Sequence, residues 1–169
     1  MKDDKQADQQ VDEVATFMHQ HELVLTTAES CTAGLIAATL ADIPGAGALL
    51  DCASVVYSVR SKQHCVGVQA ETLQRHNLTS EAVAREMAAG ALKNSHANVA
   101  IANTGVTDDT DPSIAPGTQC FAWAFKRPNE PDAQLFSETR KFNGERNEIR
   151  TAAALYALTR LPGYYSKAG

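Results

Sequence analysis

The sequence predicts an α/β fold, a three-layer α/β/α domain built on a mixed, mostly parallel sheet. Over the first two thirds of the chain, β-prone runs alternate with segments of helical periodicity, as in strands joined by crossover helices. Two β-rich runs follow one another late in the chain, which indicates an antiparallel pair. Hydrophobic residues make up 44% of the 169 residues, enough for one buried core. We expect a polar tail over residues 1–10 and a single domain over residues 11–165.

The first expected elements follow the polar residues MKDDKQADQQ. An apolar stripe with helical spacing is formed by Val11, Val14, Ala15 and Met18. Residues 23–28, LVLTTA, are typical of a short strand that is buried in a sheet. Residues 35–40, LIAATL, favour a helix, and the Pro-Gly pair at 44–45 ends it.

The middle of the chain continues the alternation. Residues 53–58, ASVVYS, predict a second strand. Thr79 or Ser80 can cap a helix that runs to about Lys93, because a hydroxyl accepts a hydrogen bond from the free N–H groups at a helix start. Residues 98–103 predict a further short buried strand, which ends at a Thr-Gly pair.

The last third begins with a loop rich in Gly, Pro, Asp and Thr over residues 106–117. The runs 118–126 and 133–142 predict a hairpin, joined across the sequence Arg-Pro-Asn-Glu-Pro. Asn143 is then the expected cap of a last helix over residues 145–160, which has apolar residues along one side.

Composition and charge exclude several classes of protein. The formal net charge of −5 argues against nucleic acid and anionic membrane surfaces as partners. No run of about 20 apolar residues is present that would span a membrane. The N-terminus is charged and polar and lacks the apolar centre of a secretory signal. We therefore expect a cytoplasmic protein without a membrane partner.

The cysteines carry no metal or disulfide pattern. Cys31, Cys52, Cys65 and Cys120 are scattered, with no Cys-x-x-Cys pair and no clustering with histidine. A disulfide framework or a zinc site needs such spacing, so we expect reduced thiols and no metal site. Cys31 lies at an expected helix start, where a thiol pKa can fall, but burial as a small apolar residue is the favoured interpretation.

The segment from Thr26 to Gly34 is the most informative for function. It leads from an expected strand through a polar turn into a helix, the place where open α/β sheets bind ligands. Free N–H groups there can hold a phosphate or stabilise an oxyanion. Ser30 lies in this turn as a candidate nucleophile. Simple helix capping by Ser30 is the alternative, and the local sequence alone favours it.

A nucleophilic serine needs a base. None of the five histidines lies near the expected carboxyl end of a strand. Lys62 is the other candidate, provided that burial lowers its pKa enough to leave a neutral amine. It follows Tyr57 by five residues, so both can reach the sheet edge that carries Ser30. An exposed lysine and a half-buried tyrosine are the alternative that spacing alone favours.

Two further charged groups invite a binding interpretation. The loop after Thr104-Gly105 contains the sequence TDDTD, but it lacks the ligand order of a Ca²⁺ loop, and a solvated loop is the favoured interpretation. Arg146 and Arg150 lie one helical turn apart and can meet a phosphate. Surface pairing of these two arginines with Glu145 or Glu148 is the simpler alternative.

Taken in order, these segments resemble one known family. The residues TAESCTAGLI from Thr27, VVYS from Val55 with Lys62, and the Thr104-Gly105 pair resemble the C-terminal domain family of CinA. The resemblance continues through TSEA from Thr79 and FNGER from Phe142 to about residue 161. It covers nearly the whole chain after the first ten residues, and the ordered combination is more specific than any one piece.

The resemblance implies a stand-alone nicotinamide-nucleotide amidase in pyridine-nucleotide recycling. Such an enzyme converts nicotinamide mononucleotide (NMN) and water to nicotinate mononucleotide and ammonia, with no metal or organic cofactor and as a homodimer. By position, Ser30 would be the nucleophile and Lys62 its general base, with Tyr57 and Thr104 completing a polar network. The implied substrate contacts are Thr32, Gly34, Gly105 and Arg146. Backbone N–H groups over residues 32–34 are the expected oxyanion donors.

The sequence departs from the family pattern at two places. Members usually carry two glycines after the Cys-Thr pair, whereas this chain has Ala33 and then Gly34. A glycine-rich stretch usually follows Thr-Gly, whereas this chain has the acidic residues of 106–112. Three aspartates would repel a nucleotide phosphate. Two alternatives therefore stay open, a non-catalytic binding or regulatory paralogue and a hydrolase of a different small amide.

Overall fold

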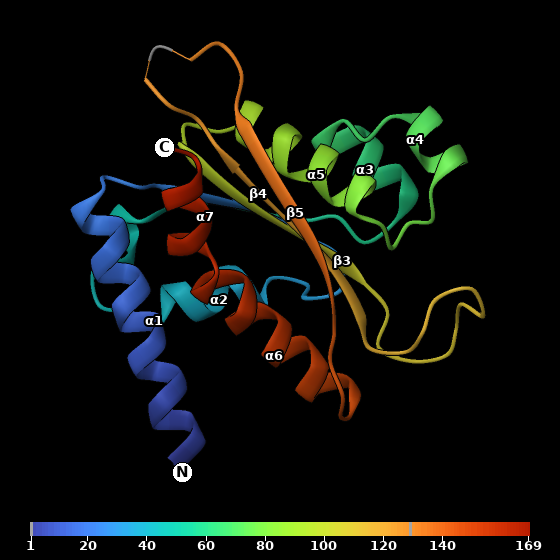
Figure 1. Ribbon diagram of the computed structural model, residues 1–169, viewed down its shortest axis with the longest axis horizontal. Helices are drawn as coiled ribbons and strands as arrows, with labels where there is room; N and C mark the ends of the chain where they lie inside the picture. The colour runs from blue at the N-terminus through green and yellow to red at the C-terminus, as the bar shows by residue number, and fades with distance from the viewer. Residues whose placement is uncertain (1, 129) are drawn as a thin grey trace.

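The computed structural model describes residues 2–128 and 130–169, and a five-stranded sheet in the order β2-β1-β3-β4-β5 forms its centre (Figure 1). The strands are β1 (Leu25–Glu29), β2 (Leu50–Val55), β3 (Val99–Gly105), β4 (Thr118–Phe125) and β5 (Gln134–Lys141). β1 pairs in parallel with β2 and β3, whereas β4 pairs antiparallel with β3 and β5. Four strands therefore run one way and β4 opposes them, which confirms the predicted mixed α/β sheet.

Helices cover both faces of this sheet. They are α1 (Lys2–Gln20), α2 (Leu35–Ala41), α3 (Val59–Val66), α4 (Ala70–Arg75), α5 (Glu81–Lys93), α6 (Arg146–Thr159) and α7 (Leu161–Lys167), and a short 3₁₀ turn spans Ala46–Ala48. In Figure 1, α1, α2, α6 and α7 lie on one side of the sheet and α3, α4 and α5 on the other. The three predicted layers are thus present. Among the described residues, no helix is long and apolar enough to cross a membrane.

The core is divided by the sheet into two layers of different character. Successive side chains of a strand point to opposite faces. On the face toward α6 and α7, β3 and β4 place large residues such as Ile101 and Trp123, and the Trp123 indole donates a hydrogen bond to Ala157 O at 2.9 Å. On the face toward α5, the same strands place alanines, such as Ala102 and Ala122. Small side chains let α5 approach the sheet closely.

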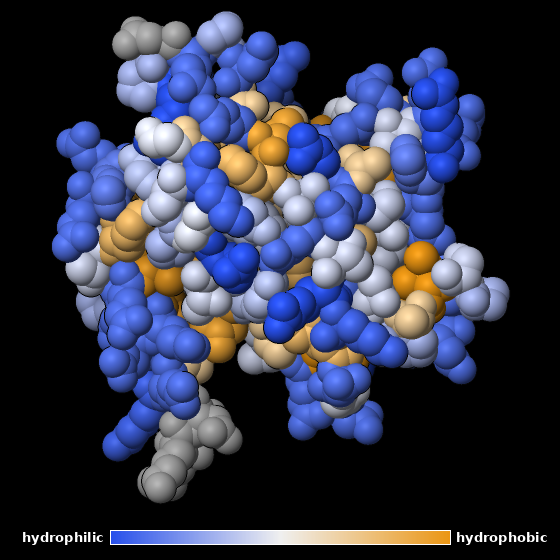
Figure 2. Space-filling view, in the orientation of Figure 1, coloured by the Kyte–Doolittle hydropathy of each residue, from blue (hydrophilic) through white to orange (hydrophobic). Residues whose placement is uncertain are grey.

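The surface is polar, as the composition predicts. Figure 2 shows that apolar residues on the face drawn occur in small groups between hydrophilic ones. Scattered apolar side chains of this kind are normal on a soluble domain. The exposed large apolar residues are Val55, Tyr57, Val59 and Leu78. Three of the four, Val55, Tyr57 and Val59, lie between the last residue of β2 and the first residue of α3, beside the site described below.

The N-terminal tail expected over residues 1–10 is corrected by the structure, apart from Met1, which lies outside the described residues. α1 begins at Lys2 and continues to Gln20, and its buried residues start at Val11. Lys, Gln and Ala are good helix formers. Once the buried stripe holds the second half of the helix, each further polar residue adds a hydrogen bond at little cost. The polar residues before Val11 predict exposure to solvent, and an exposed segment can still be helical.

Two predicted strand and helix boundaries are also corrected. The second strand ends at Val55, three residues earlier than expected, because Ser58 accepts a hydrogen bond from Ser61 N and caps α3. The last helix is capped by Glu145 and not by Asn143, in a reciprocal pair with Glu148. The hairpin of β4 and β5 is present as predicted, although Asn129 of its connection lies outside the described residues.

Candidate active site

Ser30 lies directly after β1, where the parallel strands β1 and β3 end together. Its N–H donates to Asn103 O on β3 at 2.9 Å, which fixes the turn to the sheet edge. Lys62 reaches the same point from α3, and its Nζ lies 2.8 Å from Ser30 Oγ. The candidate nucleophile and the candidate base, 32 residues apart in sequence, are therefore in hydrogen-bond contact.

Lys62 is buried, with only 1% of its surface exposed. Its Nζ also lies 2.8 Å from Val56 O and 3.2 Å from Tyr57 O, and no carboxylate of the described residues pairs with it. Burial lowers the pKa of the Lys62 ammonium to about 8, because the charged form loses its hydration. A neutral amine can give its two N–H groups to the two carbonyls and turn its lone pair toward Ser30. That is the arrangement a general base requires.

The carboxylate of Glu29 occupies the N-terminus of α2. Glu29 is fully buried, and its oxygens accept hydrogen bonds from the N–H groups of Gly34 at 2.8 Å, Ile36 at 3.0 Å and Ala37 at 3.0 Å, and from the Thr27 hydroxyl at 2.9 Å. The three backbone N–H groups are the free donors that a helix start offers to an anion. The helix start is therefore closed to a substrate by the protein's own carboxylate.

The expected oxyanion donors over residues 32–34 are consequently corrected. Thr32 N–H donates to Asn103 Oδ1 at 3.0 Å, Ala33 N–H to Ser30 O at 3.2 Å, and Gly34 N–H to Glu29. Thr32 and Gly34 are not among the residues that line the cavity at Ser30, and their role as substrate contacts stays a prediction.

A guanidinium group holds the outer side of the same turn. Arg150 donates from Nε to Cys31 O at 2.9 Å and from an Nη to Thr32 O at 3.3 Å. These contacts replace the surface pairing with Glu145 or Glu148 that was the simpler alternative for Arg150. α6 thereby ties the residues that follow Ser30 to the body of the molecule.

Two buried amides support the site from below. Asn103 Nδ2 donates to Gln119 Oε1 at 3.0 Å, and Gln119 Nε2 donates to Val106 O at 3.0 Å and lies 3.3 Å from Cys31 Sγ. A side chain at Gly105 would overlap the Gln119 amide, which would then have to leave its hydrogen bonds to Asn103 and Val106. Burial raises the pKa of the Cys31 thiol, which keeps it protonated. Cys31 is therefore a buried packing residue, as favoured from the sequence.

A cavity of about 300 Å³ opens onto the Ser30–Lys62 contact. Its lining includes Thr104, whose hydroxyl donates to Leu78 O at 2.9 Å, and Gly105. Tyr57 lies at the mouth with 58% of its surface exposed, and it meets Lys62 through its backbone carbonyl. The expected polar network of Tyr57 and Thr104 with Ser30 is thus only partly assembled, because neither hydroxyl bonds to Ser30 or Lys62 in the described structure.

A second cavity of about 210 Å³ adjoins the first, with which it shares Cys31, Tyr57, Gly105 and Val106. Arg146 lines this outer cavity. Its guanidinium lies 3.0 Å from Asp108, 2.8 Å from the Thr107 hydroxyl and 3.2 Å from the Tyr57 hydroxyl. The partner of Arg146 is therefore the acidic loop and not a neighbour on its own helix.

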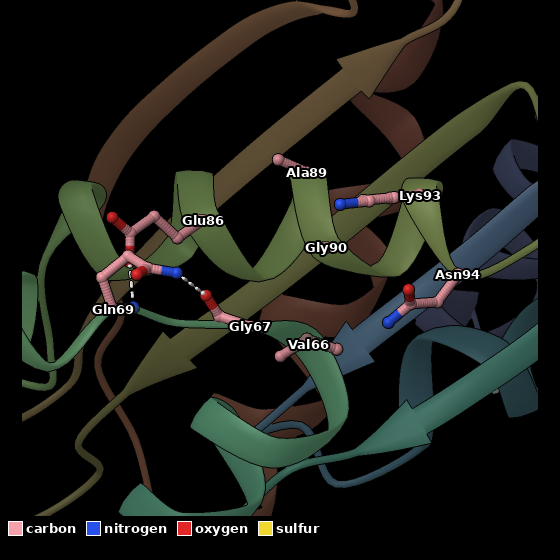
Figure 3. Close-up of a pocket in the computed structure, with 8 residues that line it drawn as sticks. All are labelled: Val66, Gly67, Gln69, Glu86, Ala89, Gly90, Lys93 and Asn94. Atoms are coloured by element: carbon pink, nitrogen blue, oxygen red, sulfur yellow. Dashed lines mark hydrogen bonds between the residues drawn. The ribbon is translucent and has the colours of Figure 1, made fainter.

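Another hollow, of about 340 Å³, lies away from Ser30 between the end of α3 and α5 (Figure 3). Glu86 accepts from Gln69 N–H at 2.8 Å along its rim. The backbone of α5 passes so close to Val66 O that a side chain at Gly90 would overlap it. This hollow holds no nucleophile beside a base. Among residues 2–128 and 130–169, no cluster of three or more His, Cys, Asp or Glu side chains is arranged to hold a metal ion.

Comparison with known proteins adds a family to this geometry. A family model described as the CinA C-terminal domain matches residues 7–164. The chain belongs to the CinA C-terminal domain family. The resemblance noted in the sequence is thereby confirmed.

Relatives in this family carry two kinds of name. The protein named nicotinamide-nucleotide amidohydrolase PncC of Escherichia coli K12 is 35% identical over 152 residues, which covers 89% of each chain. A CinA-like protein of Mycolicibacterium gilvum is 38% identical over 141 residues, which covers 80% of this chain and 32% of the relative. The chain thus spans about a third of the length of its CinA-like relatives.

A solved structure of the CinA superfamily has the same architecture. The competence damage-inducible protein A (ComA) of Klebsiella pneumoniae subsp. pneumoniae MGH 78578 superposes with a TM-score of 0.87 at 32% sequence identity. The match covers 95% of this chain and 97% of that protein. The α/β fold and its layers are therefore those of the CinA superfamily.

Proposed function

We propose that this CinA-family protein is an amidohydrolase that converts NMN and water to nicotinate mononucleotide and ammonia. The observation that carries the proposal is the 2.8 Å contact between Ser30 Oγ and a buried Lys62 that has no acidic partner among the described residues. The name of the Escherichia coli relative supports the substrate. The cavity beside Ser30 supplies the space for a carboxamide.

The reaction proceeds through a covalent intermediate. Ser30 Oγ attacks the carboxamide carbon while the neutral Lys62 amine takes the hydroxyl proton. The tetrahedral intermediate collapses as Lys62 returns this proton to the leaving nitrogen, which departs as ammonia and leaves an ester on Ser30. Water then gives a proton to Lys62 and attacks the ester, and the carboxylic acid leaves as Ser30 recovers its proton.

The N–H of Cys31 is the proposed oxyanion donor. It follows the nucleophile directly, and it makes no hydrogen bond within the described residues, whereas the N–H groups of Thr32, Ala33 and Gly34 are all used. A backbone N–H placed directly after the nucleophile is a recurring oxyanion donor in acyl-transfer enzymes. Arg150 holds Cys31 O at 2.9 Å and so fixes the peptide plane on the far side of Cys31.

Ammonia release from NMN tests the proposal. We expect Ser30→Ala and Lys62→Met to lower kcat about 10³-fold or more, because each removes one half of a unit that acts together. Lys93→Met, at an exposed position of α5, is the control and should keep wild-type turnover. Undiminished ammonia release by folded Ser30→Ala protein would refute the mechanism.

A second function, a non-catalytic binding paralogue, is favoured by one observation. The loop that carries Asp108 places an acidic group on Arg146, where a nucleotide phosphate would otherwise bind. Under this alternative, folded wild-type protein releases no ammonia from NMN or from a panel of neutral amides. Turnover of a neutral amide would instead indicate a hydrolase with a different substrate.

The cellular location and the assembly also stay predictions. The polar N-terminus and the scattered cysteines favour a cytoplasmic protein, and the family resemblance implies a homodimer with a small-molecule nucleotide substrate. Light scattering on the purified chain measures the mass of the particle and thus the assembly.

A further inference from the structure

The cation of the outer cavity is already neutralised by the protein. Arg146 donates to Asp108 at 3.0 Å, to the Thr107 hydroxyl at 2.8 Å and to the Tyr57 hydroxyl at 3.2 Å. A guanidinium has five N–H donors in a fixed plane. All three partners of the Arg146 guanidinium are residues that line the outer cavity. An incoming anion must therefore compete with Asp108 for Arg146.

A second carboxylate lines the inner cavity. Asp111 accepts from Asn77 Nδ2 at 2.7 Å and from the N–H and hydroxyl of Ser113 at 2.9 and 2.6 Å. Hydrogen bonds lower the pKa of Asp108 and of Asp111, so both are ionised at neutral pH.

The side chains that line the two cavities carry a net negative charge when Lys62 is neutral. The described lining holds two cationic side chains, Lys62 and Arg146, and two carboxylates, Asp108 and Asp111. Arg146 is paired with Asp108, and Lys62 must be neutral to act as a base. Asp111 is then the uncompensated charge in the working enzyme. A phosphate monoester, which carries about −1.5 to −2 at pH 7, is repelled by this wall, whereas a pyridinium cation is attracted.

We propose that Asp108 and Asp111 make this site select carboxamides that lack a phosphate, a pyridinium riboside in preference to the corresponding nucleotide, with Asp108 as the specificity-determining residue. The inference rests on the proposed function, because it concerns the substrate that Ser30 attacks. It adds a second substrate, the unphosphorylated nicotinamide riboside, to the NMN of the proposed function and ranks the riboside above it. The amide end meets Ser30, and the ribose end meets the Arg146–Asp108 pair.

Steady-state kinetics with nicotinamide riboside and NMN test this selectivity. We expect the wild-type protein to have the higher kcat/KM for the riboside. Asp108→Asn keeps the shape of the side chain but removes its charge and frees Arg146. It should shift the ratio of kcat/KM values toward NMN by about tenfold, through KM more than kcat, since a dianion feels a neighbouring charge over several ångströms.

Asp109→Asn is the matched control. Asp109 is exposed in the same loop and lines neither cavity, so this variant should move the ratio by less than about twofold. A wild-type preference for NMN, or a lower kcat/KM for NMN in Asp108→Asn, would overturn the inference. An equal shift in the Asp109 variant would overturn it too, because the effect would then be that of loop charge in general.

Calorimetric binding separates this inference from the proposed function. If NMN releases no ammonia, the proposed function fails, and titration of wild-type and Asp108→Asn protein with NMN and with nicotinamide riboside still decides the selectivity. Tighter binding of the riboside, reversed or reduced in Asp108→Asn, supports the inference. Tighter binding of NMN to the wild type, or binding of neither compound, contradicts it.

Discussion

At the scale of single residues, Lys62 is the most unusual side chain of the site. A lysine is almost never fully buried unless it is paired with an acid. Here two backbone carbonyls and one hydroxyl surround its Nζ, and burial removes the water that would otherwise solvate the charged form. The pKa of about 8 follows from this lack of hydration. In the proposed mechanism, this lowered pKa makes the Lys62 amine available as a base near neutral pH.

The pH dependence of catalysis follows from this pKa. Lys62 accepts a proton only as the neutral amine, so kcat/KM should rise about tenfold per pH unit below about 8 and level off above about 9. Asp111 faces the same cavity, and hydrogen bonds lower the pKa of its carboxyl, so it stays ionised over this range. A pH profile of ammonia release from the active substrate measures the effect. A flat profile between pH 6 and 8 would contradict the assignment of Lys62 as base.

Ala33 adopts a backbone conformation that favours glycine. Its φ of +49° lies in the left-handed region, which costs an L-residue roughly 1 kcal/mol or more. Ala33→Gly should therefore raise the free energy of unfolding by about 0.5–1 kcal/mol, after allowing for the greater freedom of glycine in the unfolded chain. Ala38→Gly, at an exposed position inside α2, should lower it by about 1 kcal/mol. Urea unfolding of both variants compares the two signs.

A residue's role can be predicted from sequence only where it does not depend on partners that come together in the folded protein. Ser30 and Lys62 were candidates from their residue types and their places near the expected ends of strands, but the family resemblance, and not the local pattern, favoured them as nucleophile and base. Glu29 was missed, and Arg150 was expected at a phosphate or at a neighbouring glutamate, because their partners are supplied only by folding. These partners are the N–H groups of α2 and the carbonyl of Cys31. A buried carboxylate and an exposed one look alike in a sequence.

At the scale of elements, the position of Lys62 depends on how α3 packs against α5. Lys62 projects from α3, whose last residue, Val66, touches the backbone of α5 at Gly90 (Figure 3). Neither α3 nor the short α4 was expected from the sequence. α3 has only eight residues, and its start is marked by a serine pair, Ser58 and Ser61, that also suits a loop. The β4–β5 hairpin and α5 were predicted, because their hydrophobic patterns extend over more residues.

Gly90→Ala tests this helix contact. The added Cβ would overlap Val66 O, which is backbone and cannot turn aside. We expect a loss of about 2–3 kcal/mol in the free energy of unfolding, together with lower kcat as α3 moves Lys62 away from Ser30. Gly163→Ala is the control, because its Cβ would meet nothing within 4 Å in α7, and a helical alanine should be neutral or stabilising. Equal stability of the two variants would argue against the close contact.

At the scale of the whole molecule, the two halves of the sheet have separate tasks. The parallel half, β2-β1-β3, ends at the edge that carries Ser30, whereas β4 and β5 carry the aromatic core around Trp123. Trp123 is the only tryptophan of the chain and is fully buried, so its fluorescence reports unfolding of the domain at a distance from the site. Stability and chemistry are linked through Lys62, because its burial is both a cost to the fold and the cause of its basicity.

This link predicts how stability changes with pH. Lys62 has a pKa of about 8 in the folded protein and its ordinary value of 10.5 when unfolded. Between pH 8 and 10.5 the unfolded chain therefore binds more protons than the folded one, and the contribution of Lys62 to the free energy of unfolding rises with pH in this window. The full rise from this group is roughly 3 kcal/mol. At pH 7, below both pKa values, the free energy of unfolding is lower by this full amount.

Lys62→Met isolates that contribution, because methionine keeps a similar length and has no proton to lose. Burial also raises the pKa of Cys31 and of Cys120, and that of Tyr164 to about 12, so these groups lower stability as pH rises above their unfolded values. They are present in both proteins and cancel in the difference. We expect urea unfolding, followed by Trp123 fluorescence, to show the stability of the wild type relative to Lys62→Met increasing by about 2 kcal/mol or more from pH 7 to 10. A difference that stays constant over this range would show that Lys62 is not held in the folded protein with a lowered pKa, and the proposed base would lose its physical cause.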